Sequence, residues 1–193
     1  MNEQHNKAKN PVARAAYGGV IIALAVTLGY ALAAVPNIEL VTLTLAFGGY
    51  LLGTGWGAIV GALGFGLYSA LSPYGIAPPP VFVAQIIGGA LIGIGGALLR
   101  RIFESTLKPG MSILAAAATG LIVTLIYDIL TNLGSYVAIS SKTTFVPFII
   151  GGLWFAVLHI ISNSAIFAVL FPLLTKLFKL KKKESGFRTP AAD

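Results

Sequence analysis

The sequence contains no cysteine, only two histidines and only six acidic residues in 193. The lack of cysteine excludes disulfide bonds, zinc–thiolate sites and cysteine nucleophiles. Two histidines leave little from which to build a metal site, so we expect none. Charged residues make up 10% of the chain and hydrophobic residues 56%, whereas soluble domains carry about 25% charged residues. This composition is typical of an integral membrane protein.

Charge is almost absent from two long stretches of the chain. Glu39 is the only charged residue from position 15 to position 99, and only Asp128 and Lys142 are charged from 109 to 175. Apolar stretches of about 20 residues cross a bilayer as helices. We therefore predict an all-α membrane protein with six transmembrane helices. The predicted spans are Pro11–Ala34, Leu40–Gly53, Gly55–Leu71, Pro80–Leu99, Met111–Ser135 and Pro147–Leu177.

The basic residues lie almost entirely on one side of this predicted topology. Of thirteen Lys and Arg residues, twelve lie before or at the start of the first span, between the fourth and fifth spans, or at or after the end of the sixth, and only Lys142 lies on the other side. The positive-inside rule therefore places both termini in the cytoplasm. The loops predicted outside are Pro36–Glu39, Ser72–Pro80 and Tyr136–Thr144.

These assignments divide the chain into a cytoplasmic N-terminal segment (1–10), a six-helix transmembrane domain (11–178) and a basic cytoplasmic tail (179–193). The run Lys181–Lys183 is expected to lie beside anionic lipid headgroups rather than to bind nucleic acid. The second and third spans are separated only by the glycine-rich turn Gly53–Gly57, which predicts a helical hairpin. Glycines along spans two to four are predicted to be packing surfaces, because small residues let membrane helices approach closely.

Two polar stripes mark the last two spans. At four-residue spacing, which brings side chains onto one helix face, stand Thr124, Asp128 and Asn132 in one span and Phe155, His159 and Asn163 in the other. A carboxylate facing lipid costs about 2.5 kcal/mol or more, so Asp128 should face protein or water. Two interpretations stay open. Asp128 pairs with His159 or Asn132 to fix helix packing, or the stripes form a ligand or ion site.

We favour the ligand site because aromatic residues that could stack on a planar substrate accompany the stripes. They are Tyr127, Tyr136, Phe148, Trp154 and Phe155. The predicted substrate-binding residues are Glu39, Gln85, Asp128, Asn132, Trp154, His159 and Asn163. Catalysis is not expected, because Ser162 and Ser164 lie on different helix faces from His159 and no nucleophile elbow is present.

Several segments resemble stretches of the substrate-binding S components of energy-coupling factor transporters. They are the stripe Ala15-x-x-x-Gly19-x-x-x-Ala23, Pro36–Leu40, Ala46–Gly53, Gly61–Gly64, Ser72–Pro80 and Tyr127–Leu133. The likeness covers nearly the whole chain. It implies an S-component-like bundle in the cell membrane of a prokaryote, which captures a vitamin or related micronutrient in its outer half.

The resemblance also implies the partners. In that family the S component associates with a transmembrane T component and two cytoplasmic ATPases, so ATP is hydrolysed by partner subunits and this chain needs no cofactor. A small-residue motif on the first helix docks on the T component, and Ala15, Gly19 and Ala23 match it here. The alternative is that these residues pack inside this protein.

Two other functions stay open at this stage. One is a stand-alone secondary transporter or channel in which Asp128 and His159 relay protons, although no inverted repeat with paired broken helices is visible. The other is a membrane scaffold subunit without a ligand.

Overall fold

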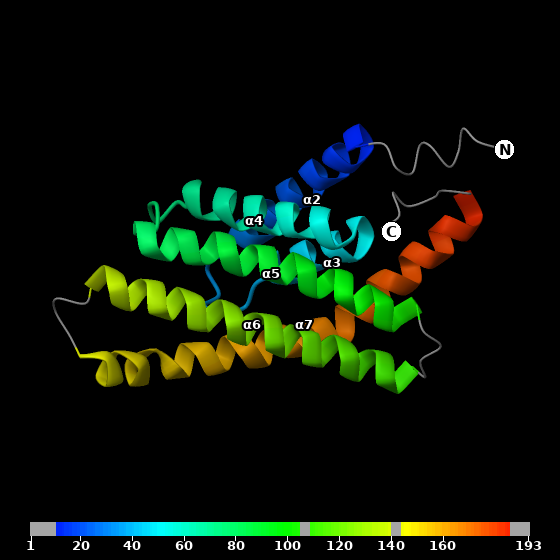
Figure 1. Ribbon diagram of the computed structural model, residues 1–193. Helices are drawn as coiled ribbons and strands as arrows, with labels where there is room; N and C mark the ends of the chain where they lie inside the picture. The colour runs from blue at the N-terminus through cyan, green and yellow to red at the C-terminus, as the bar shows by residue number, and fades with distance from the viewer. Residues whose placement is uncertain (1–10, 105–108, 140–143, 186–193) are drawn as a thin grey trace.

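The computed structural model describes residues 11–104, 109–139 and 144–185, and every regular element in these ranges is a helix. The helices are α2 (Pro11–Ala31), α3 (Val41–Leu52), α4 (Thr54–Ala70), α5 (Pro79–Glu104), α6 (Pro109–Ile139) and α7 (Phe145–Ser185). Helices α5, α6 and α7 lie side by side along the bundle, and α2 crosses it obliquely (Figure 1). The all-α prediction is confirmed for the described residues. The N-terminal segment 1–10, Lys142 and residues 186–193 of the predicted tail lie outside them.

Four helices, α2, α5, α6 and α7, are long and apolar enough to cross a membrane. The chain is thus a multi-pass membrane protein. Helices α3 and α4 have 12 and 17 residues, or about 18 and 26 Å at 1.5 Å per residue. Both are shorter than the roughly 30 Å hydrocarbon core of a bilayer. The structure therefore provides four helices long enough to span the membrane, and the shorter hairpin lies where the second and third spans, Leu40–Gly53 and Gly55–Leu71, are predicted.

Three helices run further than the predicted spans. Helix α5 reaches Glu104, α6 reaches Ile139 and α7 reaches Ser185, so the predicted outer loop from 136 and the predicted tail from 179 both begin as helix. Lys, Arg and Glu are good helix formers. A helix can therefore continue through charged residues after it has left the lipid. Within α7 lies Pro172, which cannot donate a helical hydrogen bond, and the C-terminal part of α7 changes direction (Figure 1).

Helices α3 and α4 form the predicted hairpin, and its connection is one residue long. Gly53 has a φ of 87°, which favours glycine, and its N–H donates to the Gly49 carbonyl oxygen at 2.8 Å. The hairpin packs on α5 backbone to backbone. A Cβ added at Gly93 would overlap the carbonyl oxygen of Gly57, and one at Gly61 would overlap that of Gly89. Glycine is required at these positions because the backbones touch.

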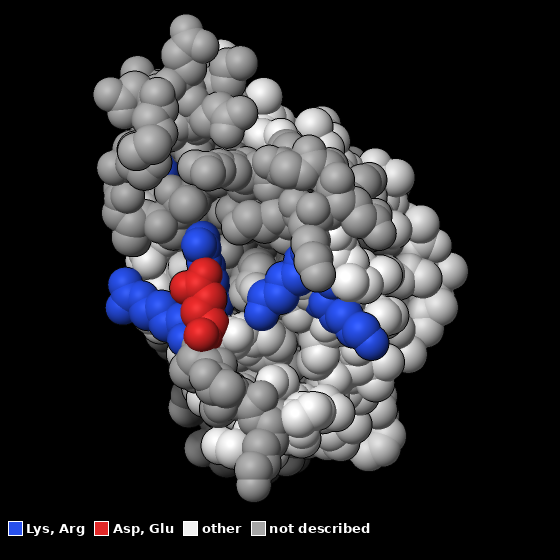
Figure 2. Space-filling view, turned by 90° about the vertical axis from the view of Figure 1, so that its right-hand side faces the viewer, with Lys and Arg blue, Asp and Glu red and all other residues white. Residues whose placement is uncertain are grey.

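The described Lys and Arg side chains gather at one end of the bundle. Helix α2 begins, and α5 and α7 end, at this end (Figure 1). Every Lys and Arg whose side chain is described belongs to these helix ends, namely Arg14, Arg100, Arg101, Lys176 and Lys179. Figure 2 shows the Lys and Arg side chains with one acidic group among them, and Arg100 Nε lies 2.7 Å from Glu104 Oε1. We refer to this end as the basic end.

The loop between α2 and α3 folds into the bundle instead of covering its outer surface. Ser162 Oγ donates a hydrogen bond to the Asn37 carbonyl oxygen at 2.6 Å. Ser162 lies 17 residues, or about 26 Å, along α7 from Phe145. In the predicted outer loop Pro36–Glu39, Asn37 and Glu39 thus reach into the bundle, while Pro36 and Ile38 are exposed. Irregular backbone at membrane depth is tolerated where protein buries it or where it lines a cavity, and this loop does both.

Candidate functional site

The imidazole of His159 lies between two carboxylates from distant parts of the chain. Its Nδ1 is 2.7 Å from Asp128 Oδ1 in α6, and its Nε2 is 3.7 Å from Glu39 Oε1 in the α2–α3 loop. The three side chains are only 12 to 17% exposed. The structure thereby brings together three of the residues that the sequence proposes for substrate binding.

Glu39 is held in place from two sides. Its Oε2 accepts a hydrogen bond from the Thr42 backbone N–H at 2.8 Å, which satisfies one of the free N–H groups at the start of α3. Its Oε1 accepts a hydrogen bond from Asn163 Nδ2 at 3.0 Å, and Asn163 is fully buried. A fourth predicted residue therefore positions the carboxylate.

The geometry favours the protonated form of His159. A neutral imidazole has one N–H and one acceptor nitrogen. If Nδ1–H donates to Asp128, a neutral ring turns the lone pair of Nε2 toward the Glu39 carboxylate, whereas an imidazolium turns an N–H toward Glu39 Oε1, 3.7 Å away. With both carboxylates ionised, the Glu39–His159–Asp128 cluster then carries a net charge of −1.

Glu39 and His159 line a cavity of about 220 Å³, which we call the loop cavity. Its walls are the end of α2, the α2–α3 loop, the start of α3, the C-terminal part of α4, the α4–α5 loop, α6 and α7. The ring centroids of Phe65 and Tyr127 are 4.6 Å apart, and those of Tyr127 and His159 are 6.2 Å apart. The carboxylate of Glu39 and the imidazole of His159 thus lie beside a wall of aromatic rings. This arrangement suits a small ring-containing molecule.

Three aromatic residues of this cavity, Phe65, Tyr68 and Tyr74, are absent from the set proposed from sequence. A signal was present, since Phe65 and Tyr68 are three residues apart near the outer end of the third span, and Tyr74 follows in the proline-rich loop. Which helix face turns inward depends on the neighbouring helices, and only the fold decides that.

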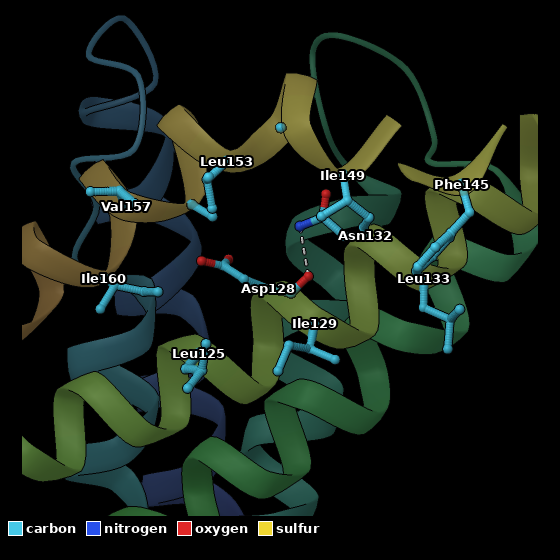
Figure 3. A pocket seen from close by; sticks show the side chains of 12 residues that line it. Leu125, Asp128, Ile129, Asn132, Leu133, Phe145, Ile149, Leu153, Val157 and Ile160 are labelled. Atoms are coloured by element: carbon cyan, nitrogen blue, oxygen red, sulfur yellow. Dashed lines mark hydrogen bonds between the residues drawn. The ribbon is translucent and has the colours of Figure 1, made fainter. Parts of the chain in front are cut away.

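A second cavity, of about 380 Å³, lies between α6 and α7 and is almost wholly apolar. We call it the lateral cavity (Figure 3). Asn132 lines it and donates a hydrogen bond from Nδ2 to the Asp128 carbonyl oxygen at 2.8 Å. Asp128 lines it as well, while its Oδ1 contacts His159 on the other side. The predicted polar set is thus divided between two cavities, with Asp128 on the boundary.

The remaining predicted residues lie elsewhere. Gln85 in α5 is half-buried and lines neither cavity. Trp154 and Phe155 are 66 and 56% exposed on α7. Tyr136 and Phe148 pack against each other near the end of α6 and the start of α7, and Tyr127 alone among the proposed aromatic residues lines the loop cavity.

The small-residue stripe of α2 lies on the outside of the bundle. Ala15, Gly19 and Ala23 are all exposed, and a Cβ added at Gly19 would meet no atom within 4 Å. The inward face of α2 is formed instead by Gly18, Ala25 and Gly29. The stripe is therefore free to contact another protein or lipid.

A comparison of the chain with protein-family models, curated proteins and solved structures finds no match. The function is accordingly argued from the site.

Proposed function

We propose that this protein is the substrate-capture subunit of an energy-coupling factor type importer. In this proposal the loop cavity binds a vitamin or related micronutrient, and the protein delivers it inward together with a T component and two ATPases. The protein binds and carries its ligand and does not transform it. The observation that carries the proposal is the loop cavity, because it joins ionisable groups to an aromatic wall inside an otherwise apolar bundle.

Burial of this kind needs a functional reason. Ionisable groups inside a membrane protein are costly and are typical of binding sites and ion pathways. The Glu39–His159–Asp128 cluster draws its members from α6, α7 and an irregular loop. A simple helix clamp would need only the Asp128–His159 pair. The additional placement of Glu39 beside open space favours binding.

The proposal includes a topology. The described basic residues all lie at the basic end, so we place this end in the cytoplasm. The chain then passes six times along the bundle, and the Gly53 connection of the α3–α4 hairpin lies on the cytoplasmic side. The loop cavity lies beyond this short hairpin, in the outer part of the bundle, where a ligand can enter from outside.

The exposed stripe on α2 suits the proposed partner. Small residues on an exposed helix face let another helix approach closely and gain dispersion contacts. Ala15, Gly19 and Ala23 present such a face, because all three are exposed and a Cβ added at Gly19 would meet no atom within 4 Å.

The test is native mass spectrometry of the detergent-solubilised protein, which identifies small molecules that co-purify. Tyr68→Ala removes part of the aromatic wall and should lower retention of the co-purifying molecule at least tenfold. The matched control is Phe155→Ala, which removes a ring of similar size from the outer surface of α7 and should leave retention unchanged. A protein that purifies empty from cells, or equal retention by both variants, would contradict the proposal.

A second candidate is a proton-coupled transporter that works without ATPases. It is favoured by one observation, the continuous contact from Glu39 through His159 to Asp128, which links the two cavities. Purified protein reconstituted alone into proteoliposomes separates the two functions. Uptake of the co-purifying molecule driven by a proton gradient would support this candidate, and uptake only with a T component and ATP would support the importer.

A further inference from the structure

We infer that the loop cavity selects a small planar organic cation. This inference rests on the proposed ligand-binding function and adds the chemical class of the ligand. It depends on three features of the cavity, which are its charge, its walls and its size.

With both carboxylates ionised, the charge of the cavity is negative. Glu39 stands at its wall, Asp128 lies behind His159, and one imidazolium cannot balance two carboxylates. All described Lys and Arg side chains lie at the basic end, and none lines the cavity. An anionic ligand would therefore meet two carboxylates without a basic partner. A ligand with one positive charge would bring the cluster to neutrality at a depth where net charge is costly.

The walls indicate that the cation is organic and planar. Phe65, Tyr68, Tyr74 and Tyr127 line the cavity, and aromatic faces attract organic cations through the ring quadrupole. A metal ion needs a denser set of ligands. Both oxygens of Glu39 already accept hydrogen bonds from Thr42 and Asn163, and within the described ranges no group of three or more His, Cys, Asp or Glu side chains is placed to hold a metal.

The size and the remaining polar groups narrow the ligand further. The cavity measures about 220 Å³, which is below the roughly 300 Å³ at which drug-sized pockets begin. The lining residue Asn37 has a buried Nδ2 without a hydrogen-bond partner among the described residues. The ligand should thus be a small ring system with a positive nitrogen and one hydrogen-bond acceptor.

The experiment uses three probes built on one ring. They are 1-methylnicotinamide, which is a permanent cation, nicotinamide, which is neutral, and nicotinate, which is an anion. Binding to the full-length protein in lipid nanodiscs is measured by saturation-transfer nuclear magnetic resonance at pH 7.5. We expect the cation to bind at least tenfold more tightly than either of the other two.

Two variants assign this preference to the cavity. Glu39→Gln keeps the shape and a hydrogen-bond acceptor but removes the charge, and it should reduce the advantage of the cation at least tenfold. Glu104→Gln, at the basic end, should leave it unchanged. An unaltered preference in Glu39→Gln would overturn the inference, as would equal binding of the three probes, or displacement of the cation by sodium ions at the same concentration.

The outcomes separate this inference from the function on which it rests. If a neutral or anionic molecule co-purifies and Tyr68→Ala releases it, the protein binds a ligand but the inferred charge is wrong. If no molecule co-purifies and no probe binds, the proposed function fails together with the inference. A co-purifying cation that Glu39→Gln releases would support both.

Discussion

Asn163 in α7 donates a hydrogen bond of 3.0 Å to Glu39, which lies 124 positions earlier in the chain. Together with the bond from Ser162 to the Asn37 carbonyl oxygen, it fastens the α2–α3 loop to the middle of α7. These two hydrogen bonds add to the 3.7 Å contact of His159 with Glu39 and to the bond from the Thr42 N–H. The loop that bounds the candidate site thus depends on two adjacent residues of the last helix.

The first prediction concerns this attachment. Asn163→Ala removes the donor to Glu39, and a buried group that loses its partner costs about 1 to 3 kcal/mol. We therefore expect a lower melting temperature of the ligand-free protein in detergent, measured by a thermal-shift assay. Ser164→Ala is the control, because the Ser164 hydroxyl bonds only to Ile160 of its own helix at 2.6 Å. Equal melting temperatures for the two variants would show that the attachment does not stabilise the fold.

The second prediction concerns the contact of α4 with α5. Gly93→Ala would bring a methyl group onto the carbonyl oxygen of Gly57, and such overpacking costs about 1 to 3 kcal/mol. Gly19→Ala, which adds the same methyl group in open space, should not destabilise the protein. The free energies of unfolding of both variants are compared in mixed micelles. A Gly93→Ala protein as stable as the parent would mean that the helices can separate at no cost.

The third prediction concerns partner docking. Gly19→Leu should abolish co-purification with a co-expressed T component, since a large side chain keeps the partner helix at a distance, while thermal stability stays unchanged. Gly18→Leu is the opposite case. Its side chain would collide with Val60, which lies 2.9 Å from a Cβ at this position, so it should destabilise the protein itself. If Gly19→Leu still captures the T component, α2 is not the docking helix.

The fourth prediction concerns topology and the position of the first loop. In this cysteine-free chain, Ile76→Cys in the α4–α5 loop should react rapidly with an impermeant maleimide on intact cells, because Ile76 is 70% exposed. Asn37→Cys should react more slowly, since Asn37 lies within the bundle. Arg101→Cys at the basic end should react only after the membrane is permeabilised. Rapid labelling of Arg101→Cys on intact cells would show that the basic end faces outward and would contradict the proposed orientation.

The membrane class, the helical content and the α3–α4 hairpin could all be predicted from the sequence. They follow from local quantities. Long uncharged stretches need lipid, backbone groups in lipid need helices, and Gly53–Gly57 leaves no room for a longer connection. The grouping of basic residues at one end also follows from the sequence, because the position of a residue along a helix fixes the helix end at which its charge lies.

The depth of the α2–α3 loop and the shape of the site required the tertiary structure. Sequence spacing placed Asp128 and Asn132 on one face of α6, and both line the lateral cavity, but it did not show that Asp128 Oδ1 contacts His159 or that Trp154 is exposed. Sequence spacing also did not show that Phe65 packs against Tyr127, that Tyr68 lines the loop cavity, or that Glu39 lies 3.7 Å from His159. A helical period fixes which residues share a face, but only the packed neighbours decide where that face points, and a loop descends into a bundle only where side chains from other helices satisfy its backbone.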